Sequence, residues 1–117
     1  MHIIKCVTEV RRMLMHEVCM AYILSRKGQP GISFFELRKI IRKVERETHL
    51  GIWRDDSDIY NTIITMRDKG YLVWDKKRKI IQPLQEIQSI LENQMLIVEL
   101  LAKKDMQRFK IAVDTSL

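Results

Sequence analysis

The sequence contains few glycines, cysteines and histidines, and these shortages exclude several kinds of functional site. Only 4 of its 117 residues are glycine, and none lies in an arrangement that cradles a phosphate, so no nucleotide-binding loop is expected. The 2 cysteines and 3 histidines occur in neither a C-x-x-C nor an H-x-x-x-H spacing, which argues against a zinc site. No pair of acids and no activated nucleophile lies in a pocket-forming context. We therefore expect no catalysis, no metal and no cofactor.

Long apolar runs are lacking as well. No uncharged apolar stretch approaches the roughly 20 residues that are needed to span a bilayer. Residues 2–12 are interrupted by Lys5, Glu9 and Arg11, which is unlike the apolar segment of a signal peptide. We expect an intracellular protein that resides in the cytoplasm.

Cys6 and Cys19 both fall on the first predicted helix, 13 positions apart. At about 1.5 Å of rise per residue they are separated by roughly 20 Å, too far for a disulfide within that helix. Two buried thiols in a reducing cytosol are the simplest interpretation, and a disulfide between two subunits is the alternative. His16 shares a helix side with Cys19 and could supply a second metal ligand, but packing explains both residues better.

Positive charge is present in excess. Lysine and arginine outnumber acids by 21 to 15, and 46% apolar content in 117 residues suffices for one core of ordinary size. Residues 1–54 hold 11 basic and 5 acidic side chains, residues 55–82 hold 6 and 5, and residues 83–117 hold 4 and 5. The excess therefore lies in the first half, where a polyanionic partner is favoured.

Residues 56–82 are the most informative stretch, because their pattern predicts a helix, a glycine stop and a hairpin. Ile59, Ile63 and Met66 recur at spacings of four and three, which places them on one face of a helix. Gly70 supplies the left-handed residue that ends this helix.

The predicted hairpin follows directly after the glycine. Residues 71–74 have the aromatic and β-branched composition of a strand, and residues 79–81 form a second short run before Pro83. Residues 75–78 are the expected turn between the two strands.

Two more helices are predicted before this stretch. Residues 3–26 carry a broad apolar stripe at helical spacing, which indicates burial on two sides. Residues 27–31 then interrupt the helix with two glycines and a proline. Ser33 and Glu36 match a capping box, so a second helix with a basic outer face is expected to begin there. Trp53, in the connection to the third helix, is expected to fill the core near that turn.

A last helix is predicted from residue 84 to about residue 111, with residues 114–117 as a frayed end. Its apolar surface exceeds what one small domain can cover, so pairing with a second copy is the economical explanation. An intramolecular hairpin with the long first helix is the alternative. The heptad positions that would form the dimer seam are Leu84, Ile87, Leu91, Gln94, Val98 and Leu101.

The order of elements in residues 56–82 resembles the recognition helix and wing of winged helix-turn-helix proteins. It consists of an amphipathic helix that ends in Lys69 and Gly70, an aromatic-aliphatic pair, a charged turn and a returning strand. The chain is similar, over roughly residues 3–82, to small MarR-like and PadR-like transcriptional regulators of archaea and their viruses. The resemblance implies an α+β fold that is mostly α. Residues 1–83 would be the DNA-binding domain, with a short strand at residues 31–32, and residues 84–117 a dimerisation helix packed on it.

The resemblance further implies sequence-specific binding to double-stranded DNA by a homodimer, whose third helices enter successive major grooves about 34–36 Å apart. The residues best placed to read bases are Ser57, Tyr60, Asn61 and Thr65. The residues expected to hold the DNA backbone, from the second helix and the wing, are Arg38, Lys39, Arg42, Lys43, Lys76, Lys77, Arg78 and Lys79.

Two other functions fit the sequence. Asp55, Asp56 and Asp58 at the start of the third helix would repel phosphates, and outward-facing Ile64 suits a protein partner as well as a DNA groove. A winged-helix adaptor for protein–protein interaction is therefore one alternative. The other is a nonspecific architectural DNA-binding protein, in which the basic second helix matters and Asn61 does not.

Overall fold

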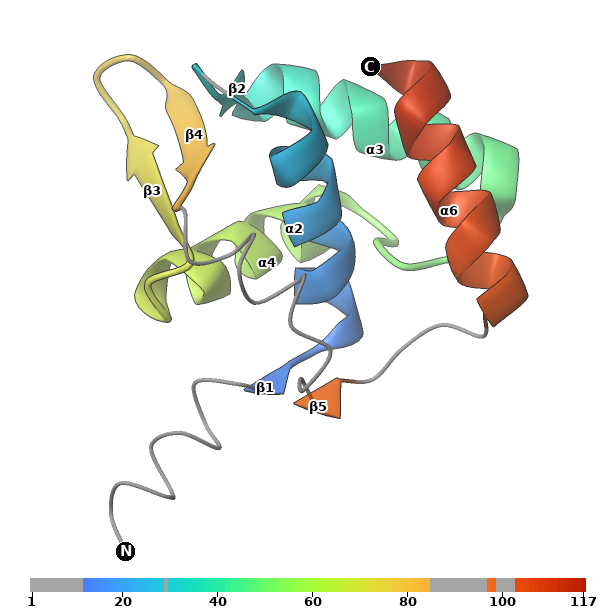
Figure 1. Cartoon of the computed structure of the whole chain (residues 1–117). Helices are drawn as coiled ribbons and strands as arrows, with labels where there is room; N and C mark the ends of the chain where they lie inside the picture. The colour runs from blue at the N-terminus through green and yellow to red at the C-terminus, as the bar shows by residue number, and fades with distance from the viewer. Residues whose placement is uncertain (1–11, 29, 85–96, 99–102) are drawn as a thin grey trace, which may run out of the picture.

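The computed structural model describes residues 12–28, 30–84, 97–98 and 103–117 (Figure 1). Within these ranges the architecture is α+β and mostly helical. The described helices are α2 (Met15–Lys27), α3 (Phe34–Thr48), α4 (Asp56–Asp68) and α6 (Lys103–Ser116), and the strands are β1 (Arg12–Met13), β2 (Ile32–Ser33), β3 (Leu72–Asp75), β4 (Ile80–Pro83) and β5 (Ile97–Val98). Crossing a membrane would need a longer and more apolar helix than any of these four.

Helix α2 begins later than the sequence pattern predicts. Strand β1 pairs in parallel with β5, and Leu14 after it is extended. The Leu14 N–H donates to the Glu17 side chain (3.2 Å), a contact that satisfies one of the free donors at the start of the helix. The predicted helix over residues 3–26 is therefore wrong where β1 and Leu14 lie, and residues 3–11 lie outside the described part of the chain.

Helix α3 begins where the capping signal predicts. The Glu36 N–H donates to Ser33 Oγ (3.1 Å), while the Glu36 carboxylate accepts from Lys27 Nζ (2.9 Å). Ser33 also belongs to β2, so the strand leads directly into the helix. The helix ends at His49, whose φ of 54° is left-handed. Its buried residues are Leu37, Ile40, Ile41, Val44 and Thr48.

The three-stranded antiparallel sheet has the order β2-β4-β3, so the short strand predicted before α3 does pair with the hairpin. Ile32 is opposite Ile81. Gly31 makes this pairing possible, because its φ is +114° and a Cβ there would lie 2.6 Å from the Ile81 carbonyl oxygen.

Helix α4 and the hairpin agree with the sequence pattern. Asp55 caps the helix by accepting from the Asp58 N–H (3.0 Å), and Gly70 after it has a φ of +80°. The turn lies one residue later than predicted, at residues 76–79, because Asp75 is the last residue of β3. The Asp75 carboxylate accepts from the backbone N–H groups of Lys77 (3.0 Å) and Arg78 (3.2 Å), and these contacts hold the turn closed. The buried residues of α4 are Ile59, Thr62, Ile63 and Met66.

Trp53 fills the core at the connection between α3 and α4, as predicted. Its side chain is 4% exposed, and its indole Nε1 donates to Thr62 Oγ1 (3.2 Å). The Phe109 ring of α6 is fully buried and lies 6.3 Å from the Trp53 ring and 6.2 Å from the Tyr22 ring. Helix α6 is thus part of the same core.

The predicted continuous helix over residues 84–111 and the frayed end after it are both wrong. Ile97–Val98 is strand β5, and α6 runs from Lys103 to Ser116. The end of α6 is held because Asp114 accepts from the Tyr22 hydroxyl (3.1 Å) and from Arg26 Nε (3.0 Å). Of the predicted dimer seam, Leu84 follows β4 and is 37% exposed, and Val98 lies in β5. The other four seam residues, Ile87, Leu91, Gln94 and Leu101, lie outside the described residues.

We expect Phe109→Ala to lower the free energy of unfolding by about 3–5 kcal/mol, because it empties a fully buried site. Ile111→Ala is the matched control, since Ile111 is 65% exposed on the same helix and its truncation should change stability by about 0.5 kcal/mol or less. Urea unfolding followed by circular dichroism measures both. Equal midpoints for the two variants would contradict the packing of α6 on this core.

Candidate nucleic-acid interface

The four predicted base-reading residues of α4 do not all point the same way. Ser57, Asn61 and Thr65 are exposed, and Tyr60 is 43% exposed. Ser57 and Asn61 lie one turn apart on the face opposite the buried residues. Thr65 and Asn61 also line a shallow pocket of about 210 Å³ beside Leu14, at the start of α2. Ser57 and Asn61 are therefore the centre of the outer face, and Tyr60 and Thr65 flank it.

Tyr60 belongs to an aromatic cluster that the sequence analysis did not predict. Its ring is 5.6 Å from that of Trp74 in β3 and 6.3 Å from that of Phe34 at the start of α3. The Phe34 and Trp74 rings are stacked at 5.9 Å with an angle of 11° between their planes. The cluster joins α3, α4 and the hairpin, so it fixes the hairpin relative to the outer face of α4.

The acidic start of α4 is paired within the chain. Asp56 accepts from Arg38 Nη1 (3.0 Å) and from Arg42 Nη2. Asp58 accepts from the Arg54 N–H (2.9 Å), and Asp55 caps the helix. The expected repulsion of phosphates is therefore reduced. Arg38 and Arg42, which were predicted to contact the DNA backbone, are therefore engaged by Asp56. Such partly exposed ion pairs contribute only about 0–1 kcal/mol, so the arginines can exchange Asp56 for another partner.

The remaining cations of α3 lie on another side of the helix. Lys39 Nζ is 5.3 Å from the centre of the Phe35 ring, and the side chains of Lys39 and Lys43 are exposed. Among the described residues no carboxylate lies within ion-pair distance of Lys39, Lys43 or Arg46. All three residues line a groove with the end of α6, and Arg46 also borders a cleft on the side of α4.

The hairpin tip carries four consecutive exposed cations, at residues 76–79. Arg78 Nε is 3.8 Å from Asp75 Oδ2, and Lys76 Nζ is 5.9 Å from the centre of the Trp74 ring. The two remaining lysines, Lys77 and Lys79, form no ion pair with any described residue. The tip is thus the most concentrated positive charge on the described sheet.

An ion pair between an exposed lysine and a buried glutamate holds the end of α4 against α2. The Glu17 side chain is only 2% exposed and accepts from Lys69 Nζ at 2.8 and 3.1 Å. It also accepts from the Leu14 N–H. Sequence reasoning missed this pair, and the one available signal was an acid within the apolar stripe of the first helix.

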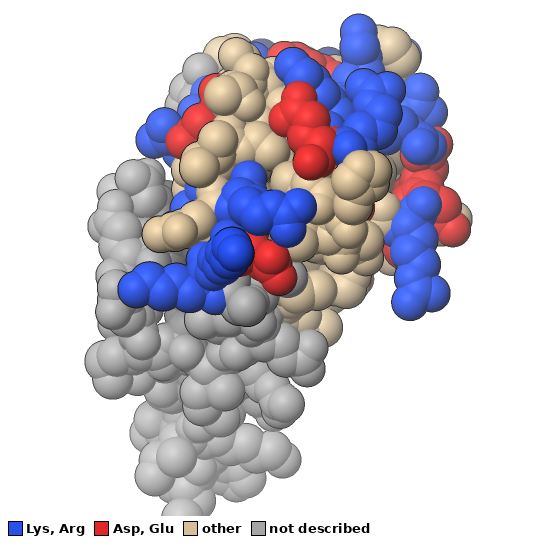
Figure 2. Space-filling model, turned by 90° about the vertical axis from the view of Figure 1, so that its right-hand side faces the viewer, with Lys and Arg blue, Asp and Glu red and all other residues tan. Residues whose placement is uncertain are grey.

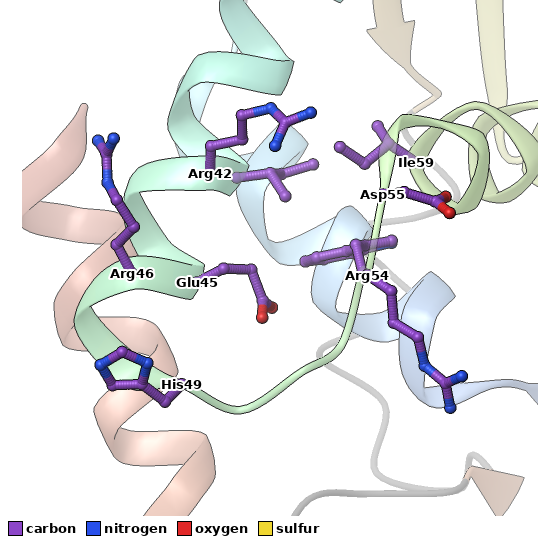
Figure 3. A pocket seen from close by; sticks show the side chains of 9 residues that line it. Arg42, Glu45, Arg46, His49, Arg54, Asp55 and Ile59 are labelled. Atoms are coloured by element: carbon purple, nitrogen blue, oxygen red, sulfur yellow. The ribbon is translucent and has the colours of Figure 1, made fainter.

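A cleft of about 290 Å³ lies between the second half of α3 and the connection to α4 (Figure 3). Its floor is apolar, and charged residues surround it. Arg46 and Arg54 point away from each other on opposite sides of the cleft, and the Glu45 carboxylate accepts from the N–H groups of Gly51 (2.9 Å) and Ile52 (3.1 Å). Because its polar groups do not converge, the cleft carries no ligand assignment.

Metal binding has no support in the described residues, where no group of three or more histidine, cysteine, aspartate or glutamate side chains comes together. Cys19 is fully buried, which agrees with its interpretation as a structural thiol. Burial, and then the nearby Glu45 charge, raise the pKa of Cys19 from 9.0 to about 12. Cys6 lies outside the described residues.

We expect Cys19 to react with a thiol reagent only after unfolding, because the thiol is inaccessible and its raised pKa keeps it protonated. The measurement uses a Cys6→Ser variant, in which Cys19 is the remaining thiol, at pH 8 with and without denaturant. Since an exposed thiol ionises above its ordinary pKa of 9.0, this cysteine should also make the folded state less stable as the pH rises from 9 towards 12. Rapid labelling of the native protein would contradict the assignment.

No protein-family model matches this chain, and no match was found among curated proteins or solved structures.

Proposed function

We propose that this protein is a winged-helix transcriptional regulator that binds double-stranded DNA as a homodimer, with α4 in the major groove and the β3–β4 hairpin on the sugar-phosphate backbone. Three features support the proposal. The order of α3, α4 and hairpin, with β2 completing the sheet, is compatible with a winged helix. The outer face of α4 is polar, and the hairpin tip is strongly basic.

The aromatic cluster of Phe34, Tyr60 and Trp74 is the observation that carries the proposal. Because Tyr60 flanks the outer face of α4 and Trp74 lies in β3 close to the hairpin turn, the contact of their rings at 5.6 Å joins the two candidate DNA-binding elements. A B-DNA major groove is about 12 Å wide and admits one helix, while an adjacent hairpin can reach the flanking backbone. A rigid link between the two elements fixes both contacts without further ordering on binding.

Asn61 is the proposed base-reading residue, since a carboxamide can form two hydrogen bonds with adenine in the major groove. Ser57 would contact the DNA bases beside Asn61. The cations of the hairpin tip, at residues 76–79, would contact phosphates. Arg38 and Arg42 would also contact phosphates, which would replace Asp56 as their partner. The dimer would form through residues 84–101, and its two α4 helices would be about 34–36 Å apart.

The test of the proposed function is selection from a random-sequence duplex pool, followed by fluorescence anisotropy on the enriched sites at several salt concentrations. Enrichment of a palindrome with half-sites about one helical turn apart is expected. Binding that depends on salt without any enrichment would replace this proposal by an architectural role.

We expect Asn61→Ala to reduce the preference for the selected site over random duplex, with little change in binding to random duplex. A loss of about 1–3 kcal/mol in discrimination is the magnitude of one bidentate base contact. Gln107→Ala, an exposed change on α6, is the control and should alter neither affinity. Equal losses on both DNA sequences would refute the base-reading role.

We expect Lys77→Ala combined with Arg78→Ala to weaken binding to every duplex and to reduce the slope of log affinity against log salt by about 2, because each phosphate contact contributes about 0.9. Lys103→Ala combined with Lys104→Ala is the control, since it removes the same charge from exposed positions on α6. If both double variants give the same slope, general charge rather than the wing accounts for binding.

A protein–protein adaptor is the second candidate, and one observation favours it. Apolar side chains are exposed on α4 and on the hairpin, with Tyr60 at 43% and Val73 at 48% exposure, and Arg38 and Arg42 already have a carboxylate partner. Absence of DNA binding at moderate salt would favour this candidate.

A further inference from the structure

A groove of about 680 Å³ lies between α3 and the end of α6, away from the outer face of α4. The two helices pack against each other, and α6 ends above α3 near the top of the molecule in Figure 1. The volume is within the range of roughly 300–1,000 Å³ of sites that enclose small ligands or short chain segments. Its charged lining residues are Glu36, Lys39, Arg42, Lys43 and Arg46.

The charges of the groove are mostly positive and only partly compensated. Glu36 is neutralised by Lys27 (2.9 Å), and Arg42 is engaged by Asp56. Lys39, Lys43 and Arg46 have no carboxylate partner in the described part of the chain. Lys and Arg side chains gather toward the top of the molecule in Figure 2, the end at which α3 and the C-terminus lie in Figure 1. The unpaired positive charge favours a ligand that carries negative charge.

The groove also offers an exposed aromatic ring at one end. Phe35 is 61% exposed, and its ring has the Arg38 guanidinium at 5.7 Å and the Lys39 ammonium at 5.3 Å. Leu117, on the α6 side of the groove, is 47% exposed. A ligand of phosphates alone would leave these apolar groups in water, whereas a peptide can carry an apolar side chain next to its acids.

The spacing of these side chains fits an extended peptide. Phe35, Lys39 and Lys43 are one helical turn apart, so each step along α3 is about 6 Å. Side chains on the same side of an extended peptide are about 6.7 Å apart, since every second residue points the same way at roughly 3.3 Å per residue. A peptide with one apolar residue followed by acids at alternate positions would therefore match the order on α3.

We propose that the groove between α3 and α6 binds an extended acidic segment of a partner protein, with an apolar side chain on Phe35 and alternate carboxylates on Lys39, Lys43 and Arg46. The site shares Arg42 with the proposed DNA surface, but it does not depend on the proposed DNA binding, because it includes neither the outer face of α4 nor the hairpin. A DNA duplex is too wide to enter a depression of this size and could touch only its rim.

The test uses a short fluorescein-labelled peptide, Leu-Ser-Glu-Ser-Glu-Ser-Glu, and a peptide of the same composition in the order Leu-Ser-Ser-Glu-Glu-Glu-Ser. Fluorescence anisotropy with the full chain should show several-fold tighter binding of the first peptide. Phe35→Ala and the double change Lys39→Ala with Lys43→Ala should each weaken it by about tenfold, the size of a hot-spot contact. All three positions are exposed, and circular dichroism checks that the variants fold.

The controls are Lys103→Ala with Lys104→Ala for charge and Ile111→Ala for apolar surface, because none of these residues lines the groove. Equal binding of the two peptides, absence of binding, or equal losses in the controls would overturn the proposal. On a selected DNA duplex, the Lys39 and Lys43 double variant should bind like the wild type. A loss as large as that of the Lys77 and Arg78 variant would instead assign these lysines to the DNA surface.

Discussion

Helix α2 is apolar around most of its circumference, so it must be covered on several sides before it is stable in water. Cys19, Met20, Ala21 and Ile23 are all fully buried. Helix α4 covers one side of α2, the sheet covers another through β4, and α6 covers a third. The arrangement of the DNA-binding candidates, α4 and the hairpin, follows from this demand for burial rather than from contacts that they make with each other alone.

Local signals predicted the elements between residues 33 and 83 because each was determined by its own neighbours. The Ser33 cap, the buried stripe of α4 and the left-handed Gly70 depend on residues within one or two turns. Helix α2 and the C-terminal region were mispredicted because apolar spacing continues smoothly past points where the chain leaves the helix. The Leu14 contact with Glu17 marks the start of the first helix, and Phe109 of α6 is buried in the core of the same chain.

The candidate sites depend on contacts between residues far apart in the sequence, which periodicity cannot predict. The composition showed that the second helix is basic, but not that Asp56 engages Arg38 and Arg42 on the side of α4. The same helix presents its unpaired cations toward α6. One helix thus carries cations that are paired on the side of α4 and cations that are unpaired on the side of α6, and Arg42 borders both sides.

The two tryptophans lie in different surroundings, and each therefore gives a separate optical signal. Trp53 is 4% exposed at the junction of α3, α4 and α6, so its emission reports whether the core is intact. Trp74 is half-buried in β3 close to the hairpin turn, with Lys76 over its ring. An aromatic ring in that position can sense a base or a side chain that arrives at the hairpin. Single-tryptophan variants would thus separate unfolding from binding without any attached dye.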